Sequence, residues 1–525
     1  MKKTLLLSLS VISLLLACNG FKETPEVGTV LAAHFNNKLY KKFDTAVYNV
    51  VFRKHLDSLK KDFSNPKTLG SFYRSKGDQP VLVTRHFASG GLDTLYSYLQ
   101  SSGQHGVNSK IFASGKIESL LGVLRANTFK SIEEVYPVVA DLELYAAEAL
   151  DKYTGYIQYG GLNPKKILNR YYIEVRRPDT LSIFKTLDTE DLVKSLKDMQ
   201  PSSDQYLALQ RMLAKYKLDS TGRKKEIKAI LVNMERLRWK LPELGKEYIE
   251  VNIPDFTLTW HAGKDTLSHM KVCVGGRREK AYEEKMKVYA KTGNLSDLPK
   301  NHQTPLIYST MKSIQANPIW NIPVSIARSE IYYMAMKDPY YLSNNNIQVY
   351  YKGKLVGDPD TIQWSRYPRE KLPFQFKQGS GVMNALGKFK FIFDNSSSIY
   401  LHDTNNKNGF RMANRAISHG CIRLERPLEF AEKLVDNKNM YDQLRMEVGL
   451  APLDTNNNRI YRKKLARKAD TLNVFKLKPA WFAAKKPVPL LINYKTAWWQ
   501  NGGMQYREDI YDLDESLWIA MKKFL

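Results

Sequence analysis

The sequence predicts an α+β protein in which a mostly helical N-terminal domain precedes a mainly β domain with an inserted capping subdomain. One observation behind this prediction is length, because 525 residues exceed what one hydrophobic core normally organises. The other is a change in the spacing of apolar residues along the chain. Apolar residues recur at three- and four-residue steps up to residue 240 and alternate with polar residues beyond it.

The surface is predicted to be basic. The chain has 80 Lys and Arg residues against 53 Asp and Glu residues, a formal net charge of +27. Such a surplus favours anionic partners: nucleic acid, lipid headgroups or an acidic polymer. Apolar content of 43% and charged content of 25% are near globular averages, so disorder is not indicated.

The N-terminus has the pattern of a bacterial lipoprotein. In "MKKTLLLSLSVISLLLAC" a basic start precedes an apolar run too short to span a membrane, and the end resembles a lipobox. We expect a signal peptide over 1–18, lipid on Cys18 and a tether over 19–38; plain secretion is the alternative. An exported, periplasm-facing protein would meet membrane phosphates and wall polymer, so nucleic acid is not expected as a partner. Asn19 in place of Asp favours the outer membrane.

Residues 39–240 are predicted to form a helical scaffold domain. The stretches "IESLLGVLRA", "VYPVVADLELYAAEALDKY" and "YLALQRMLAKY" carry apolar residues at helical spacing, with Gly and Pro between them.

Residues 246–450 are predicted to be the mainly β domain. "YIEVNIPDFTLTWHAGKDTLSHMKVCVGG" and "GKFKFIFDNSSSIYLHD" alternate around the turns "HAGKD" and "DNSSS", which predicts two hairpins. Residues 325–378, rich in Tyr, Asn and Pro, are predicted to be the capping insertion. Pro427 is expected to open a helix over 427–438. In the extension 451–525, strands within "VPLLINYKTAWWQNGGMQYRED" are expected to return to the core.

Cys421, in "RAISHGCIRLERP", is the candidate nucleophile. A reactive thiol needs a depressed pKa or a neighbouring base. His419 is close to Cys421 in sequence. His402 is the better base candidate, because it shares the open face of its strand with Tyr400 while the alternate residues face the core.

Other interpretations of Cys421 compete with this one. A structural cysteine would not need polar neighbours such as Ser418. A zinc site of His402, His419 and Cys421 lacks paired-ligand spacing, so no metal is expected. The "CGSCW"-type motif of papain-like proteases is missing from the sequence. A disulfide to Cys273 stays open and would remove the nucleophile.

"HDTNNKNGFRMANRAISHGCIRL" resembles the signature of L,D-transpeptidases, the YkuD-type catalytic domain: a His, a mid-teens gap, then Ser/Thr-His-Gly-Cys. Blocks in the family's order, from "NMERLRW" through "QTPLIYSTMKSIQANPIWNIP" to "INYKTAWW", resemble its long capped subclass over residues 135–512. The small peptidoglycan-binding module that such chains often carry has no counterpart here. Glycan binding would then fall to basic stretches such as "GRKK" (222–225) and "RKKLARK" (462–468), although such stretches are more often ordinary solvated charge.

The resemblance implies roles for the motif residues. Cys421 would form a thioester with the substrate, and His402, oriented by the backbone carbonyl of Asp403, would take the thiol proton. His419 and the amides of Gly420 and Cys421 would hold the oxyanion.

Substrate contacts are expected from Tyr400, Arg423, Ser418 and Trp364. Tyr400 lies on the open face, and Arg423, two residues beyond the nucleophile, is placed to meet a carboxylate or to serve as an ordinary surface arginine. Trp364 belongs to the aromatic insertion, a candidate lid.

The reaction implied by the resemblance is acyl transfer on peptidoglycan stem peptides without a cofactor. The enzyme would cleave the bond between a diamino acid and terminal D-Ala of a tetrapeptide, and an amine of a second stem would resolve the thioester to give a 3→3 crosslink. Alternatives are a carboxypeptidase, attachment or release of a protein at the wall, and a non-enzymatic wall anchor. Wall-synthesis proteins are possible partners.

Overall fold

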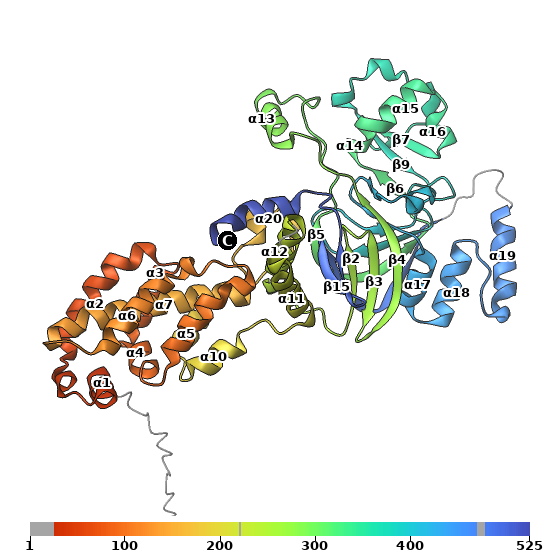
Figure 1. Ribbon diagram of the computed structural model, residues 1–525. Helices are drawn as coiled ribbons and strands as arrows, with labels where there is room; N and C mark the ends of the chain where they lie inside the picture. The colour runs from red at the N-terminus through yellow and green to blue at the C-terminus, as the bar shows by residue number, and fades with distance from the viewer. Residues whose placement is uncertain (1–25, 220–221, 470–477) are drawn as a thin grey trace, which may run out of the picture. The chain divides into compact units, whose positions relative to one another are not determined.

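The computed structural model describes residues 26–219, 222–469 and 478–525, which form two compact units (Figure 1). The first unit runs up to Gly103 and includes Asn108–Gly155 and Pro178–Gln200. The second contains Gln104–Val107, Tyr156–Arg177 and Pro201–Leu525. The predicted signal peptide, including Cys18, lies outside the described residues. Among the described residues, no helix combines the length and apolar character that crossing a membrane requires.

The first unit is helical, as the apolar period predicts. Its central helix is α7 (Val135–Tyr159), which continues into the second unit. Around it lie α1 (Val27–Phe35), α2 (Thr45–Leu59), α3 (Pro66–Ser75), α4 (Val81–His86), α5 (Gly91–Gln100), α6 (Ser114–Ala126), α9 (Thr180–Leu187) and α10 (Leu192–Asp198).

One buried carboxylate ties this unit together. Glu143 of α7 accepts hydrogen bonds from the backbone amides of Leu82 and Val83 at 3.0 and 2.8 Å, and from the Tyr73 hydroxyl at 2.8 Å. Those amides belong to the first turn of α4, whose donors have no partner within the helix. Glu143 therefore serves as a distant cap for α4.

The predicted tether is wrong from Val27 onward. Residues 27–35 form α1, and its apolar side chains Val27, Leu31 and Ala32 are buried. The next turn is also anchored, because Tyr40 is buried and its hydroxyl donates to Asn127 at 2.7 Å. The scaffold thus begins before residue 39.

The second unit begins with helices that the sequence analysis assigns to the scaffold. α11 (Asp204–Leu218) and α12 (Lys224–Arg238) belong to it, together with the short helix α8 (Pro164–Ile167) and the strand β1 (Tyr171–Tyr172). The predicted scaffold range 39–240 therefore contains parts of both units.

A fully buried ion pair fixes these helices. Arg238 and Glu235 of α12 lie 2.7 Å apart with both side chains at 0% exposure. The guanidinium also donates to the hydroxyls of Tyr206 and Tyr156 at 2.9 and 3.1 Å. Glu235 accepts from the Leu162 amide at 2.8 Å. The pair satisfies polar groups from three separate segments, which offsets its desolvation.

The second unit is built on a ten-stranded sheet in the order β1-β5-β10-β11-β13-β4-β3-β2-β14, with β12 on β4. The bounds are β2 (Glu247–Asn252), β3 (Thr257–Ala262), β4 (Asp265–Gly275), β5 (Leu306–Ala316), β10 (Phe389–Phe393), β11 (Leu401–His402), β12 (Ala416–Ser418), β13 (Ile422–Leu424) and β14 (Ala480–Asn493). Both predicted hairpins, β3–β4 and β10–β11, are present.

The sheet closes on itself through the C-terminal extension. β14 pairs in parallel with β2 and antiparallel with β5, so the strand that the sequence analysis expects to return bridges these two strands. The phenylalanines 389, 391 and 393 of β10 are all buried in the core enclosed by the strands.

Further helices and a small hairpin complete this unit. They are α13 (Tyr282–Thr292), α17 (Pro427–Val435), α18 (Lys438–Glu447), α19 (Asn458–Ala469), α20 (Leu513–Met521) and the strands β15 (Ala497–Gln500) and β16 (Gly503–Tyr506). α17 begins at Pro427 as predicted and ends at Val435, where Asp436 takes a left-handed conformation.

The predicted insertion is a subdomain with a core of its own. Its sheet has the order β6-β9-β7-β8, with β6 (Trp320–Ile322), β7 (Ile347–Tyr351), β8 (Lys354–Leu355) and β9 (Phe374–Gln378). The helices α14 (Val324–Ile326), α15 (Tyr332–Lys337) and α16 (Tyr341–Asn344) pack with it (Figure 1). We call residues 320–378 the cap.

Replacing Arg238 with Ala should destabilise the second unit by about 3–5 kcal/mol, because Glu235 would remain as a buried charge without its partner. Urea unfolding followed by tryptophan fluorescence measures this loss. Lys225→Ala, an exposed site on the same helix, is the control. A loss for Arg238→Ala within about 0.5 kcal/mol of the control would contradict the assigned role.

Candidate active site

A short parallel strand pair places the predicted nucleophile beside the predicted base. β11 runs parallel to β13, with His402 opposite Arg423, and the amide just after Cys421 donates to the Tyr400 carbonyl at 3.1 Å. Tyr400 and Cys421 therefore lie side by side, each directly before the first paired residue of its strand, Leu401 or Ile422. Because side chains alternate along a strand, Tyr400 and Cys421 share one face with His402 and Arg423.

The thiol of Cys421 is partly buried and free, and Cys273 is free as well, so the two cysteines form no disulfide. Burial raises the pKa of Cys421. Hydrogen bonds from the amide and hydroxyl of Tyr400, and the positive charges of Lys390 and Arg423, oppose that rise without cancelling it. The resting cysteine is therefore a protonated thiol.

His402 is buried and held in one orientation. Its Nδ1 hydrogen-bonds the backbone carbonyl of Asp403, as the resemblance implies. A carbonyl only accepts, so Nδ1 carries the proton and Nε2 has the free lone pair. Burial lowers the pKa of His402 to about 3, and the charges of Arg423 and Lys390 act in the same direction. The imidazole is neutral at physiological pH.

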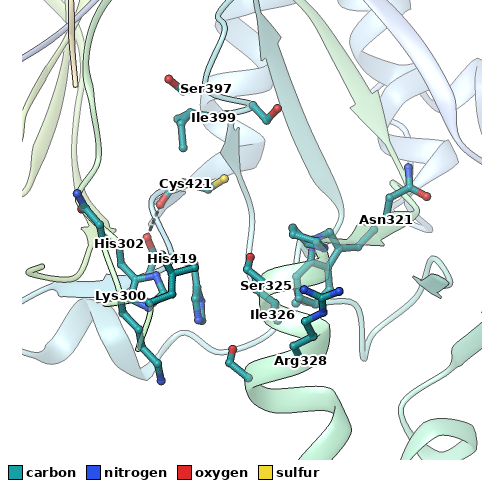
Figure 2. A pocket seen from close by; sticks show the side chains of 18 of the residues that line it. Lys300, His302, Asn321, Ser325, Ile326, Arg328, Ser397, Ile399, His419 and Cys421 are labelled. Carbon is teal, nitrogen blue, oxygen red and sulfur yellow. Dashed lines mark hydrogen bonds between the residues drawn. The ribbon is translucent and has the colours of Figure 1, made fainter. Parts of the chain in front are cut away.

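The thiol and the imidazole share a cavity of about 960 Å³ between the sheet and the cap. Figure 2 shows the Cys421 sulfur in its open middle, with His302 and His419 on one side and Ser325 and Arg328 on the other. No hydrogen bond joins Cys421 to His402 within the described part of the chain. The sulfur instead has Tyr400 as its hydrogen-bonding neighbour.

The cavity wall is basic. The charged residues that line it are Arg170, Lys300, Arg328, Arg369, Glu370, Lys390 and Arg423. Its one carboxylate, Glu370, pairs with Arg369. The Nε atoms of Arg328 and Arg423 are buried and find no hydrogen-bond partner among the residues that the structure describes. Within residues 26–219, 222–469 and 478–525, no group of three His, Cys, Asp or Glu side chains is placed to hold a metal.

Comparison with known proteins agrees with this geometry. Residues 246–446 match the L,D-transpeptidase catalytic domain (YkuD), and residues 67–213 match the Scaffold domain. A Haemophilus influenzae protein named "Putative L,D-transpeptidase" is 27% identical over 302 residues, 56% of this chain and 51% of the relative. The chain thus spans about half the length of that relative.

The chain carries a YkuD-type L,D-transpeptidase catalytic domain. The Scaffold domain precedes it.

In this transpeptidase domain, the Ser-His-Gly-Cys motif forms a tight turn. The Ser418 hydroxyl donates to the Cys421 carbonyl at 2.6 Å and accepts from the Gly420 amide at 3.1 Å. Gly420 has φ +123°, and a Cβ there would meet Ile399 at 3.2 Å, so the turn requires glycine. Its amide is already bonded to Ser418, so an oxyanion must displace that hydroxyl before it can use this donor.

His419 points to the cap. Its Nε2 lies 2.5 Å from Glu330, and its ring meets His302 edge to face with centroids 4.5 Å apart. His419 does line the cavity. With its Nε2 bound to Glu330, it connects the motif to the cap, and only its Nδ1 is left for the predicted oxyanion role.

The predicted substrate role of Trp364 is wrong. Trp364 is buried in the core of the cap, where it packs against Tyr332, Phe374 and Phe376, and it does not line the cavity. Tyr400, Arg423 and Ser418 do line it, and Ser418 chiefly shapes the turn.

Sequence reasoning missed Lys390, which lies between two buried phenylalanines of β10 and lines the cavity. Trp320, in the block "NPIW", also lines the cavity and interacts with the Tyr400 hydroxyl. The alternation in "FKFIF" could have indicated that Lys390 and His402 share a face, because the two strands form a hairpin.

The His402 ring should remain unprotonated from pH 5 to 9, since burial and two neighbouring cations oppose a charge on it. Histidine-selective NMR on the whole protein measures this, and the signal lost in His402→Asn assigns the ring. A His402 signal that titrates near pH 6.5, the ordinary value for histidine, would show that its site is open to solvent.

Proposed function

We propose that this protein is a peptidoglycan L,D-transpeptidase that acts through a thioester on Cys421. It cleaves the diamino acid–D-Ala bond of a tetrapeptide stem and forms a 3→3 crosslink with a second stem. The observation that supports this best is the shared face of Cys421 and His402 inside a cavity large enough for peptide chains.

The resting state fits a concerted attack. The Cys421 sulfur attacks the carbonyl carbon as the S–H proton passes to Nε2 of His402, and the resulting imidazolium then protonates the departing D-Ala amine. An amine of a second stem attacks the thioester, gives its proton to His402, and releases the thiol. A neutral imidazole with a free Nε2 lone pair suits each acceptor step.

The charge of the cavity fits the substrate. Stem peptides carry free carboxylates, and the wall offers cations with only one carboxylate among its charged residues, itself paired. Arg328 of the cap and Arg423 of the sheet hold buried Nε donors without partners, which suits groups that arrive with the substrate. The relative's name is that of an L,D-transpeptidase, consistent with this chemistry.

We further propose that the protein is an exported lipoprotein held at a membrane by Cys18 and facing the periplasm. The basic N-terminal start, the short apolar run and the lipobox-like ending support this. Cys18→Ser should abolish incorporation of labelled palmitate and move the protein from the membrane to the soluble fraction. Unchanged fractionation of this variant would reject the lipid anchor.

Cys421→Ala should eliminate 3→3 crosslinked dimers, because it removes the thiol that forms the proposed acyl intermediate. The measurement is mass analysis of products from purified enzyme and tetrapeptide stems. Cys273→Ala, at the other described cysteine, is the matched control and should retain activity. Release of free D-Ala without dimers by the wild type would instead identify a carboxypeptidase, and dimers made by Cys421→Ala would overturn the proposal.

A further inference from the structure

The thiolate of Cys421 needs a counter-charge that His402 does not supply at rest. In a thiolate–imidazolium pair the histidine carries the positive charge. Here burial lowers the pKa of His402 to about 3, so its ring is neutral. The sulfur is also partly buried, and an unpaired anion is costly there. Besides the hydrogen bonds from Tyr400, a fixed cation close to the sulfur would stabilise the anion.

Lys390 is placed to be that cation. It lies on β10 directly opposite His402 of β11, so its side chain projects on the same face as the catalytic pair. Its ammonium lies 4.0 Å from the centroid of the Tyr400 ring, and Tyr400 is the neighbour of the sulfur. Lys390 lines the cavity and is partly buried.

The charge of Lys390 meets the Tyr400 ring but, in the part of the chain that the structure describes, no acidic side chain. Among the described residues, no carboxylate lies within 4 Å of its ammonium, whereas Lys407 has Asp403. A partly buried cation without a carboxylate is unfavourable unless an anion appears beside it. The anion that the proposed reaction creates on this face is the Cys421 thiolate.

We propose that Lys390 is a positioning residue for the nucleophile, whose ammonium holds the negative charge on Cys421 as the thiol gives up its proton. This inference rests on the proposed function only in taking Cys421 as the nucleophile. In the free enzyme the S–H bond breaks and the proton leaves to water. In the reaction it passes to His402, and in both cases Lys390 stays protonated.

The groups that face the sulfur agree with this role. Tyr400 and His402 come from β11, Lys390 from β10 and Arg423 from β13, and none of these is an acid with a negative charge. Each of the two charges affects the other group. Burial lowers the pKa of Lys390, and the charge of Cys421 opposes that shift. Burial raises the pKa of Cys421, and the charge of Lys390 opposes that rise. Arg423 contributes too, but it also lies opposite Cys273 in the ladder.

The test is the pH dependence of Cys421 alkylation by iodoacetamide in the whole protein, with no stem peptide present. Only the thiolate reacts, so the rate follows its population. Lys390→Met should shift the profile to higher pH and slow alkylation at pH 7 on the order of tenfold. Lys390→Arg, which keeps the charge, should restore the wild-type profile. Lys388→Met, at an exposed lysine two residues earlier, should leave it unchanged.

The outcomes separate this inference from the proposed function. If Lys390→Met and wild type give the same profile, or if Lys390→Arg shifts it as Lys390→Met does, Lys390 is not the counter-charge. Lys390→Gln, which keeps a polar end, repeats the measurement should the Met variant unfold, as checked by circular dichroism. A shifted profile in an enzyme that makes no crosslinks would support the role of Lys390 and reject the transpeptidase reaction instead.

Discussion

The parallel pairing of β11 with β13 is the constraint on which the site depends. β11 has two residues and β13 three, yet their register sets His402 opposite Arg423 and brings Tyr400 beside Cys421. A slip of one residue would turn the thiol to the other face of the sheet. Two such short strands hold this register because β10 and β4 flank them on either side.

That register also sets the charge state of the resting site. The same face that gathers the thiol and the imidazole gathers Lys390 and Arg423. His402 is buried there, and the other three residues are partly buried. Burial and cations together keep His402 neutral, while the cations ease the burial penalty on the thiolate. The site is therefore arranged for a proton that moves during attack, in contrast to a preformed ion pair.

Local pattern predicted much of this and failed where the outcome depended on distant partners. Alternation and turn residues are local, so the hairpins and the motif around Cys421 could be predicted. Trp364 could not be placed, because an aromatic residue in an insertion can face substrate or build the insertion's own core, and only the cap's fold decides. Lys390 looks like an ordinary polar strand residue until the cap and β11 enclose it. Val27 looks like tether until α1 packs against the scaffold helices.

The closure of the sheet explains why the site needs chain far beyond its motif. The matched catalytic range ends at residue 446, whereas β14 begins at Ala480 and lies between β2 and β5. Without β14, both of those strands would present unpaired edges, which are prone to association. β5 in turn supports β10, which carries Lys390 and pairs with β11. β14 is thus connected to β11, the strand beside Cys421, through three successive strand pairings: β14–β5, β5–β10 and β10–β11. It forms part of the sheet that fixes the catalytic face.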